Sequence, residues 1–147
     1  MHRDEIGRVY KREHLSSSGS PITEQDAYFE YDKGNGGIGK LSLEWKGDLS
    51  SPNLIGSSLT YDFWGRVTSN TKVINDSMFK TEFSYDMMNR TKRITYPSNV
   101  PTFPPDEAWY YYDRQGNVER IWWSSMDTTT ITNGVGEVIK KIEYDNL

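Results

Sequence analysis

The chain of 147 residues contains no cysteine, only two histidines and only two alanines. Without cysteine it forms neither a disulfide scaffold nor a thiolate metal site, and two histidines are too few for a metal cluster. We therefore expect no metal and no cofactor. Scarce alanine together with 14% aromatic residues disfavours helices and favours strands, which predicts an all-β protein.

The sequence also lacks a basic cluster and any long hydrophobic run. Its 21 acidic residues outnumber 17 basic ones, for a net charge of −4, and the counterion release that drives nucleic-acid binding requires a positive surface. No segment reaches the length of a membrane span, and the charged residues 1–15 do not resemble a signal peptide. We expect no nucleic-acid partner and no membrane span.

The dipeptide Tyr-Asp recurs through the chain. It occurs five times, and Asp4 fits the same frame, so that successive aspartates are 24 to 32 residues apart. The aspartates are Asp4, Asp32, Asp62, Asp86, Asp113 and Asp145. This spacing predicts a single repeat region over 1–147 with about five to six copies of one structural unit.

Glycine or asparagine follows most of these aspartates after three residues. An aspartate that begins a type I turn accepts hydrogen bonds from N–H groups ahead of it, and the fourth residue then adopts a positive φ. The predicted turn residues are Asp62 with Gly65, Asp86 with Asn89, and Asp113 with Gly116. Polar and apolar residues alternate beside the turns, as in 79–85, so each copy is a predicted β-hairpin with one apolar face.

The recurring pattern Tyr-Asp-x-x-Gly-Arg-hydrophobic resembles the YD repeats of the Rhs family over essentially the whole chain. Residues 31–41 and 85–97 carry the resemblance most clearly, while Asn89 replaces the glycine and Asn117 replaces the arginine. The resemblance implies consecutive hairpins that form a curved or spiralling antiparallel sheet, part of a shell or barrel. In this family such shells enclose C-terminal toxin domains, and the related teneurins use a barrel in adhesion.

The resemblance also implies a function without enzymatic activity. The chain would be a structural segment of a shell that encapsulates or presents a C-terminal toxin or effector domain, secreted or at the bacterial cell surface. Its partners would be the rest of the shell and the enclosed polypeptide. Because residues 144–147 stop inside a copy and the self-cleavage motif of the family is missing, we expect a fragment of a larger protein.

Aromatic residues gather in 109–112 and 122–123. Neighbouring strand residues point to opposite faces, so both faces of this hairpin are predicted to be aromatic. The outer face is either covered by another layer or by a neighbouring turn of a spiral, or it is a platform that stacks on sugar rings. The alternative function is an extracellular carbohydrate-binding or cell-surface adhesion module, with Tyr110, Trp122 and Trp123 as candidate binding residues.

Two catalytic interpretations are weaker. The repeated aspartates could act as a glycosidase carboxylate pair, but a residue that recurs at one turn position in every unit serves every unit. Residues 34–39 match the dinucleotide fingerprint, yet 40–45 alternates like a strand where that fingerprint requires a helix. We expect a glycine-rich hairpin loop there and no catalytic residue.

Overall fold

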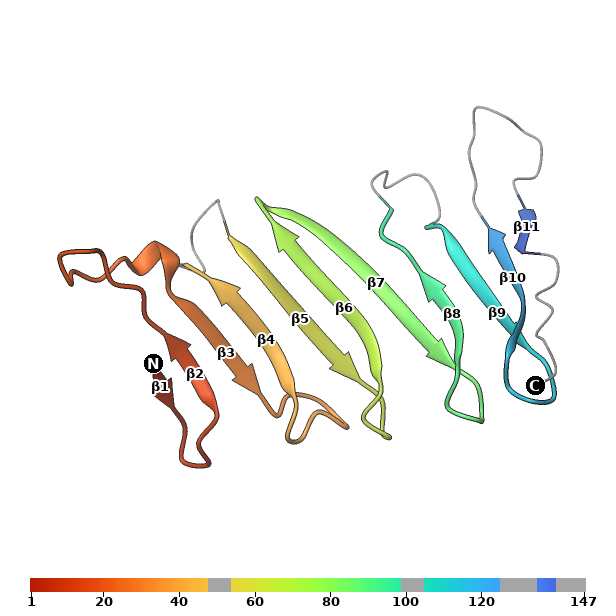
Figure 1. The fold of residues 1–147 in the computed structure, drawn as a ribbon, viewed down its shortest axis with the longest axis horizontal. Coiled ribbons are helices and arrows are strands. Elements are labelled where there is room, and N and C mark those ends of the chain that lie inside the picture. Colours follow the sequence, from red (N-terminus) through yellow and green to blue (C-terminus); the bar gives the residue numbers. More distant parts are fainter. Residues whose placement is uncertain (48–53, 99–104, 125–134, 140–147) are drawn as a thin grey trace. The chain divides into compact units, whose positions relative to one another are not determined.

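The computed structural model describes residues 1–47, 54–98, 105–124 and 135–139. Within these ranges, strands that are adjacent in the sequence form antiparallel pairs. The helical content of the same ranges is one short 3₁₀ turn, η1 (Thr23–Gln25). The predicted all-β fold of consecutive hairpins is confirmed (Figure 1).

Two compact units divide the chain, residues 1–80 and residues 81–147. The first unit contains the strands β1 (His2–Arg3), β2 (Val9–Arg12), β3 (Ala27–Tyr31), β4 (Leu41–Lys46), β5 (Ile55–Tyr61) and β6 (Val67–Ile74). Strand β7 (Ser77–Tyr85) begins in the first unit and ends in the second, which also contains β8 (Thr91–Thr95), β9 (Glu107–Tyr112), β10 (Val118–Ser124) and β11 (Val135–Ile139).

A β-bulge follows the turn of each described copy. In the copy at Asp86, Tyr85 pairs with Thr91 and Ser84 pairs with Arg93, so Lys92 is the additional residue. The same one-residue shift occurs between β1 and β2, β3 and β4, β5 and β6, and β9 and β10. Because side chains alternate between faces, each bulge changes which residues of the two strands lie opposite one another.

One face of the first unit is held by an aromatic pair. Tyr28 and Trp45 are cross-strand partners, and their rings stack with centroids 5.1 Å apart. Gly56 lies opposite Trp45 on the next strand, where an added Cβ would lie 3.2 Å from the Trp45 Cβ. Glycine therefore leaves room for the tryptophan side chain at this position of the sheet.

Few side chains are buried in the described residues. Ala108 is the only buried hydrophobic residue among them, and the buried polar residues are Asp26, Ser42, Ser69 and Thr95. The described residues thus form no apolar core of their own. Backbone ladders and side-chain pairs on the sheet faces hold these hairpins together.

A tight turn that the sequence analysis did not anticipate joins β6 to β7. Asn75 and Asp76 both have positive φ, 48° and 63°, as in the two-residue type I′ turn of a β-hairpin. The last predicted copy, at Tyr144 and Asp145, lies outside the described residues. Across the part of the chain that the structure describes, no helix has the length and apolar character needed to cross a membrane.

Candidate functional site

The repeated aspartate organises each turn through its side chain. In the turn after β5, the Asp62 Oδ1 atom accepts hydrogen bonds from the N–H of Trp64 at 3.0 Å and of Arg66 at 2.9 Å. The N–H of Asp62 donates to the Arg66 carbonyl, and the N–H of Gly65 donates to the Asp62 carbonyl, both at 2.9 Å. Gly65 has a φ of 76°, which a glycine adopts without steric cost.

The other copies repeat this geometry. The Oδ1 atoms of Asp4, Asp86 and Asp113 accept the N–H four residues ahead at 2.8, 2.9 and 2.8 Å. Asn89 and Gly116 occupy the position of Gly65, with φ values of 66° and 94°. Asparagine is among the residues that tolerate this left-handed conformation, which accounts for its presence at 89.

An arginine completes the turn. The Nε atoms of Arg8, Arg66 and Arg90 donate to the Oδ2 atoms of Asp4, Asp62 and Asp86 at 2.7, 2.6 and 2.7 Å. In the copy at Asp113 the amide of Asn117 donates to the aspartate instead, at 3.2 Å. Charge-assisted bonds are shorter and stronger than neutral ones, so the arginine copies hold their carboxylates more tightly.

The tyrosine of Tyr-Asp bonds to the preceding hairpin in three of the described copies. The hydroxyl groups of Tyr31, Tyr61 and Tyr112 donate to the carbonyls of Val9, Leu41 and Thr91 at 2.9, 2.6 and 2.6 Å. Each acceptor is the residue that follows the basic residue of the preceding turn. The dipeptide therefore combines a reversal, set by the aspartate, with a contact between hairpins, made by the tyrosine.

The basic residue of one turn also lies over the tyrosine ring of the next. Arg8 lies 4.5 Å from the Tyr31 ring centroid, Lys40 lies 5.5 Å from that of Tyr61, and Arg90 lies 4.2 Å from that of Tyr112. These are cation–π distances. The sequence did not predict these contacts of the tyrosines and the basic residues. The constant position of both beside the aspartate and glycine is the feature that could have indicated them.

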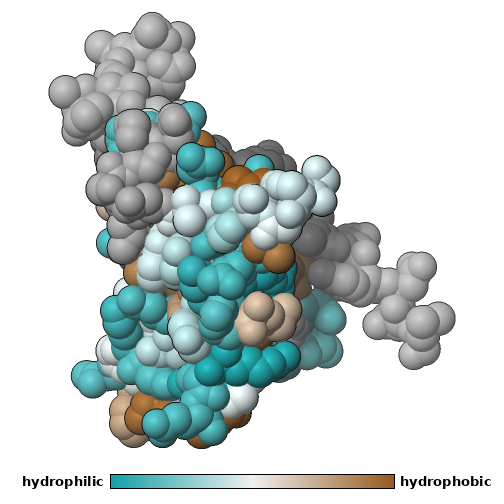
Figure 2. All heavy atoms as spheres, turned by 90° about the vertical axis from the view of Figure 1, so that its left-hand side faces the viewer, coloured by the Kyte–Doolittle hydropathy of each residue, from teal (hydrophilic) through white to brown (hydrophobic). Residues whose placement is uncertain are grey.

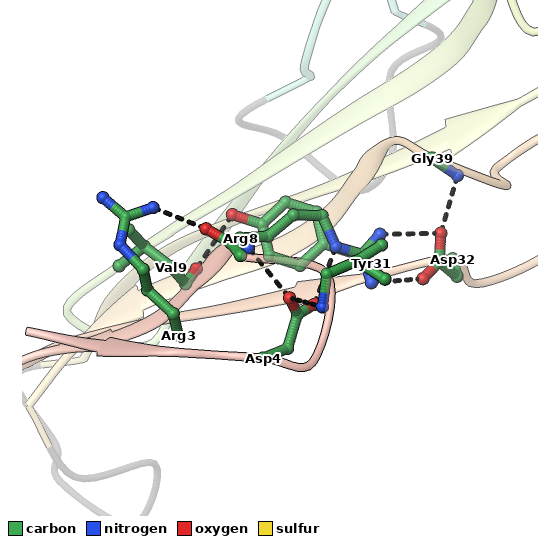
Figure 3. A network of polar contacts seen from close by, with 9 residues as sticks. Arg3, Asp4, Arg8, Val9, Tyr31, Asp32 and Gly39 are labelled. Carbon is green, nitrogen blue, oxygen red and sulfur yellow. Dashed lines mark hydrogen bonds and ion pairs between the residues drawn. The ribbon is translucent and has the colours of Figure 1, made fainter.

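Arg8 makes the most extensive of these contacts. Besides Asp4, its guanidinium binds both carboxylate oxygens of Asp32, at 3.0 and 2.7 Å (Figure 3). These bonds, with the N–H of Gly39 at 2.6 Å, hold the pKa of Asp32 below its ordinary value despite partial desolvation. Two carboxylates from neighbouring turns thus share one guanidinium.

The glycine-rich segment forms the loop between β3 and β4, as predicted, and a strand follows it where a dinucleotide site would need a helix. Gly36 packs on the next turn, since a Cβ added there would lie 1.7 Å from the Asp62 carbonyl oxygen. Close approach of two backbones accounts for the glycine at this position.

The three candidate sugar-binding residues divide between two faces of β9 and β10. Tyr110 pairs with Ile121 and Trp123 pairs with Ala108 on one face, while Trp122 pairs with Trp109 on the other. Trp123 lies beside Tyr96, with ring centroids 5.2 Å apart. Trp122 is the most exposed of the three, at 38%. Because the three side chains lie on opposite faces of the sheet, one flat ligand does not contact all of them.

Polar groups accompany the tryptophans on the Trp109 face. Glu107 accepts bonds from the Trp109 indole at 3.0 Å, from Arg93 at 3.1 Å and from Thr95 at 3.2 Å. The Arg93 guanidinium lies 5.2 Å from the Trp109 ring centroid. The exposed Trp122 thus lies opposite Trp109, whose indole contacts this carboxylate and this guanidinium.

A shallow groove crosses strands β3 to β6 of the first unit. It has a volume of about 410 Å³ and is lined mainly by Phe29, Ile55, Ile74, Lys46 and Lys72. Among the described residues, no group of three or more histidine, aspartate or glutamate side chains is placed to hold a metal ion.

No family model matches the chain, and no curated protein matches it.

Proposed function

We propose that the chain is a structural, non-enzymatic segment of a larger β-sheet shell that encapsulates or presents another polypeptide, secreted or at the bacterial cell surface. The observation that supports this proposal is the Tyr-Asp contact between hairpins, which recurs at Tyr31, Tyr61 and Tyr112. When each unit binds the preceding unit, the addition of units extends the sheet.

The sparse burial supports the same proposal. A hairpin strip with a single buried hydrophobic residue among its described residues leaves apolar side chains on its faces for another polypeptide to cover. The first and last strands, β1 and β11, each have one paired neighbour in the strand order. Unpaired strand edges bind further strands.

Association and protection test the proposal. We expect light scattering to show that the full chain associates as its concentration rises, because its outer strands have unpaired edges and its faces carry uncovered apolar side chains. A reporter peptide with one protease site, fused after Leu147, should be cleaved more slowly in the associated form than in a dilute sample. Monodisperse monomers at high concentration, or equal cleavage in both forms, would contradict the shell.

A carbohydrate-binding module is the second candidate function, favoured by exposed Trp122 beside Trp109, Arg93 and Glu107. Glycan-array binding should then be lost on Trp122→Ala and kept on Trp123→Ala, because the two side chains lie on opposite faces. Loss on Trp123→Ala and Tyr110→Ala with retention on Trp122→Ala would move the site to the other face. Absence of glycan binding by the unmodified chain would remove this candidate.

A further inference from the structure

The turn tips of the first unit carry large apolar side chains exposed to solvent. The exposed fractions are 75% for Ile6, 84% for Ile38, 85% for Phe63 and 76% for Trp64. Ile6 and the pair Phe63–Trp64 occupy the central positions of the aspartate turns, and Ile38 lies in the glycine-rich loop. A type I turn accepts most residues at its centre, so the reversal itself does not explain these apolar side chains.

The three turns that carry these tips are neighbours. Arg8 of the first turn binds Asp32 at the start of the glycine-rich loop, and Gly36 of that loop packs on Asp62 of the third turn. The three turns follow β1, β3 and β5, so they lie at the same ends of the antiparallel strands (Figure 1). Ile6, Ile38, Phe63 and Trp64 therefore form one row, called the tip row below.

Polar groups directly behind the tip row have partners within the protein. The N–H groups of Ile6 and Trp64 donate to the carboxylates of Asp4 and Asp62 at 3.2 and 3.0 Å. Arg8 and Arg66 neutralise the same carboxylates. These N–H groups and the carboxylates of Asp4 and Asp62 therefore enter an apolar medium already paired. The exposed side chain of Glu5, next to Ile6, limits the first turn to the headgroup level of the bilayer.

We propose that the tip row inserts into the interfacial layer of a lipid bilayer and binds the protein peripherally to a membrane. Protruding tips suit a deformable lipid surface, whereas a protein hot spot requires a matching pocket. Indole rings favour the membrane interface, and the exposed Trp64 ring lies 4.9 Å from the Arg66 guanidinium.

The charge around the tip row indicates which lipid it binds. Over residues 4–8, 32–40 and 62–66, four acidic residues are balanced by four basic ones: Asp4, Glu5, Asp32 and Asp62 against Arg8, Lys33, Lys40 and Arg66. Figure 2 shows that the surface seen from the β1 side is mainly hydrophilic, with separate hydrophobic patches. Without a charge excess, burial of apolar side chains drives binding, so zwitterionic lipid suffices and salt has little effect.

The second unit carries a similar tip. Met87 and Met88, at the centre of the Asp86 turn, are 105% and 74% exposed, and the N–H of Met88 donates to Asp86 at 2.9 Å. The next turn of this unit has Arg114 and Gln115 at its centre. Apolar tips thus belong to particular turns and are no requirement of the repeat.

Sedimentation with dioleoylphosphatidylcholine vesicles tests the proposal. The full chain should bind, and Phe63→Ser with Trp64→Ser should weaken its partitioning by about tenfold or more, because two large apolar side chains no longer leave water. Met78→Ser is the matched control, since Met78 is 70% exposed but follows the turn at Asn75–Asp76 at the opposite ends of the strands. The control should stay within about twofold of the unmodified chain, and raising the salt from about 0.1 M to about 1 M should change little.

Brominated phosphatidylcholine places the tip row within the bilayer. Trp64→Phe keeps an apolar tip, so this variant should still bind but lose the part of the fluorescence quenching that Trp64 contributes. Failure of the unmodified chain to bind, equal binding of the double serine variant, or unchanged quenching in Trp64→Phe would each overturn the proposal. If the double serine change abolishes self-association in light scattering while vesicles bind nothing, the tip row contacts protein and the lipid proposal is wrong.

Discussion

The turns at Asp4 and Asp113 have the same backbone reversal but differ in the contacts of the residue four positions after the aspartate. In the first, Arg8 binds the aspartate of its own turn and continues to Asp32 and Tyr31 of the next hairpin. In the second, Asn117 donates to Asp113 through an uncharged amide. Aspartate, the positive-φ residue and a side-chain donor four residues after the aspartate are common to both, so the reversal does not require that donor to be charged. Arginine adds a connection between hairpins, and the two tasks are separable by mutation.

Gly36→Ala should produce the largest effect, because it acts where one hairpin approaches the next. The new Cβ would lie 1.7 Å from the Asp62 carbonyl oxygen, at a residue with a φ of 78°. We expect a loss of about 3 kcal/mol or more in the free energy of unfolding, measured by urea denaturation.

Gly34→Ala is the control for that substitution. Gly34 has a similar φ of 76°, but nothing lies within 4 Å of its added Cβ, so only backbone strain of about 1 to 2 kcal/mol remains. Equal losses in the two variants would show that the approach to Asp62 contributes nothing.

Arg8→Gln should have the next largest effect on stability. It removes the ion pairs to Asp4 and Asp32, whose side chains are 26% and 41% exposed, and we expect a loss of about 1 to 2 kcal/mol by urea denaturation. Lys33→Gln removes an exposed pair with Glu30 and should cost under about 0.5 kcal/mol. A cost for Arg8→Gln no larger than that of Lys33→Gln would refute the connection between hairpins.

Acid should weaken the same connection, together with the ion pairs of Glu13 in the first hairpin. Bonds from Arg8 lower the pKa of Asp32, and bonds from His2 and Lys11 lower the pKa of Glu13 to about 2. A carboxyl with a lowered pKa in the folded state stabilises the protein above its unfolded pKa, and this contribution is lost as pH falls through the folded value. Stability should therefore fall between about pH 4.5 and about pH 2. The fall should be smaller in Arg8→Gln, and an equal fall would contradict the assignment.

Tyr112→Phe removes only the hydroxyl that donates to Thr91 at 2.6 Å. The ring and its contact with Arg90 remain, so we expect a loss of about 1 kcal/mol in the free energy of unfolding. Tyr10→Phe is the control, since Tyr10 is 46% exposed, and it should change stability by less than about 0.5 kcal/mol. Identical values would remove the tyrosine from the contact between hairpins.

Sequence periodicity predicted the turns at Asp62, Asp86 and Asp113 because the residues that shape each of them lie within four positions of the aspartate. The tyrosine contact escaped prediction because its acceptor, such as Val9 for Tyr31, lies on another hairpin. Alternation predicted aromatic residues on both faces of β9 and β10. It did not predict that Trp122 lies opposite Trp109, because the bulge between Val118 and Arg120 sets that register.

Asn117→Arg should produce the smallest effect, in the stabilising direction. It restores the side chain that Arg66 and Arg90 use against their own aspartates, and replacing a neutral amide bond with a charge-assisted one should add about 0.5 kcal/mol. Gln115→Arg adds the same charge at the exposed turn centre, away from the Asp113 carboxylate, and should leave stability unchanged within error. If both variants gain equally, the benefit comes from net charge. If Asn117→Arg alone gains, the arginine of the other turns strengthens a reversal that aspartate and glycine already form.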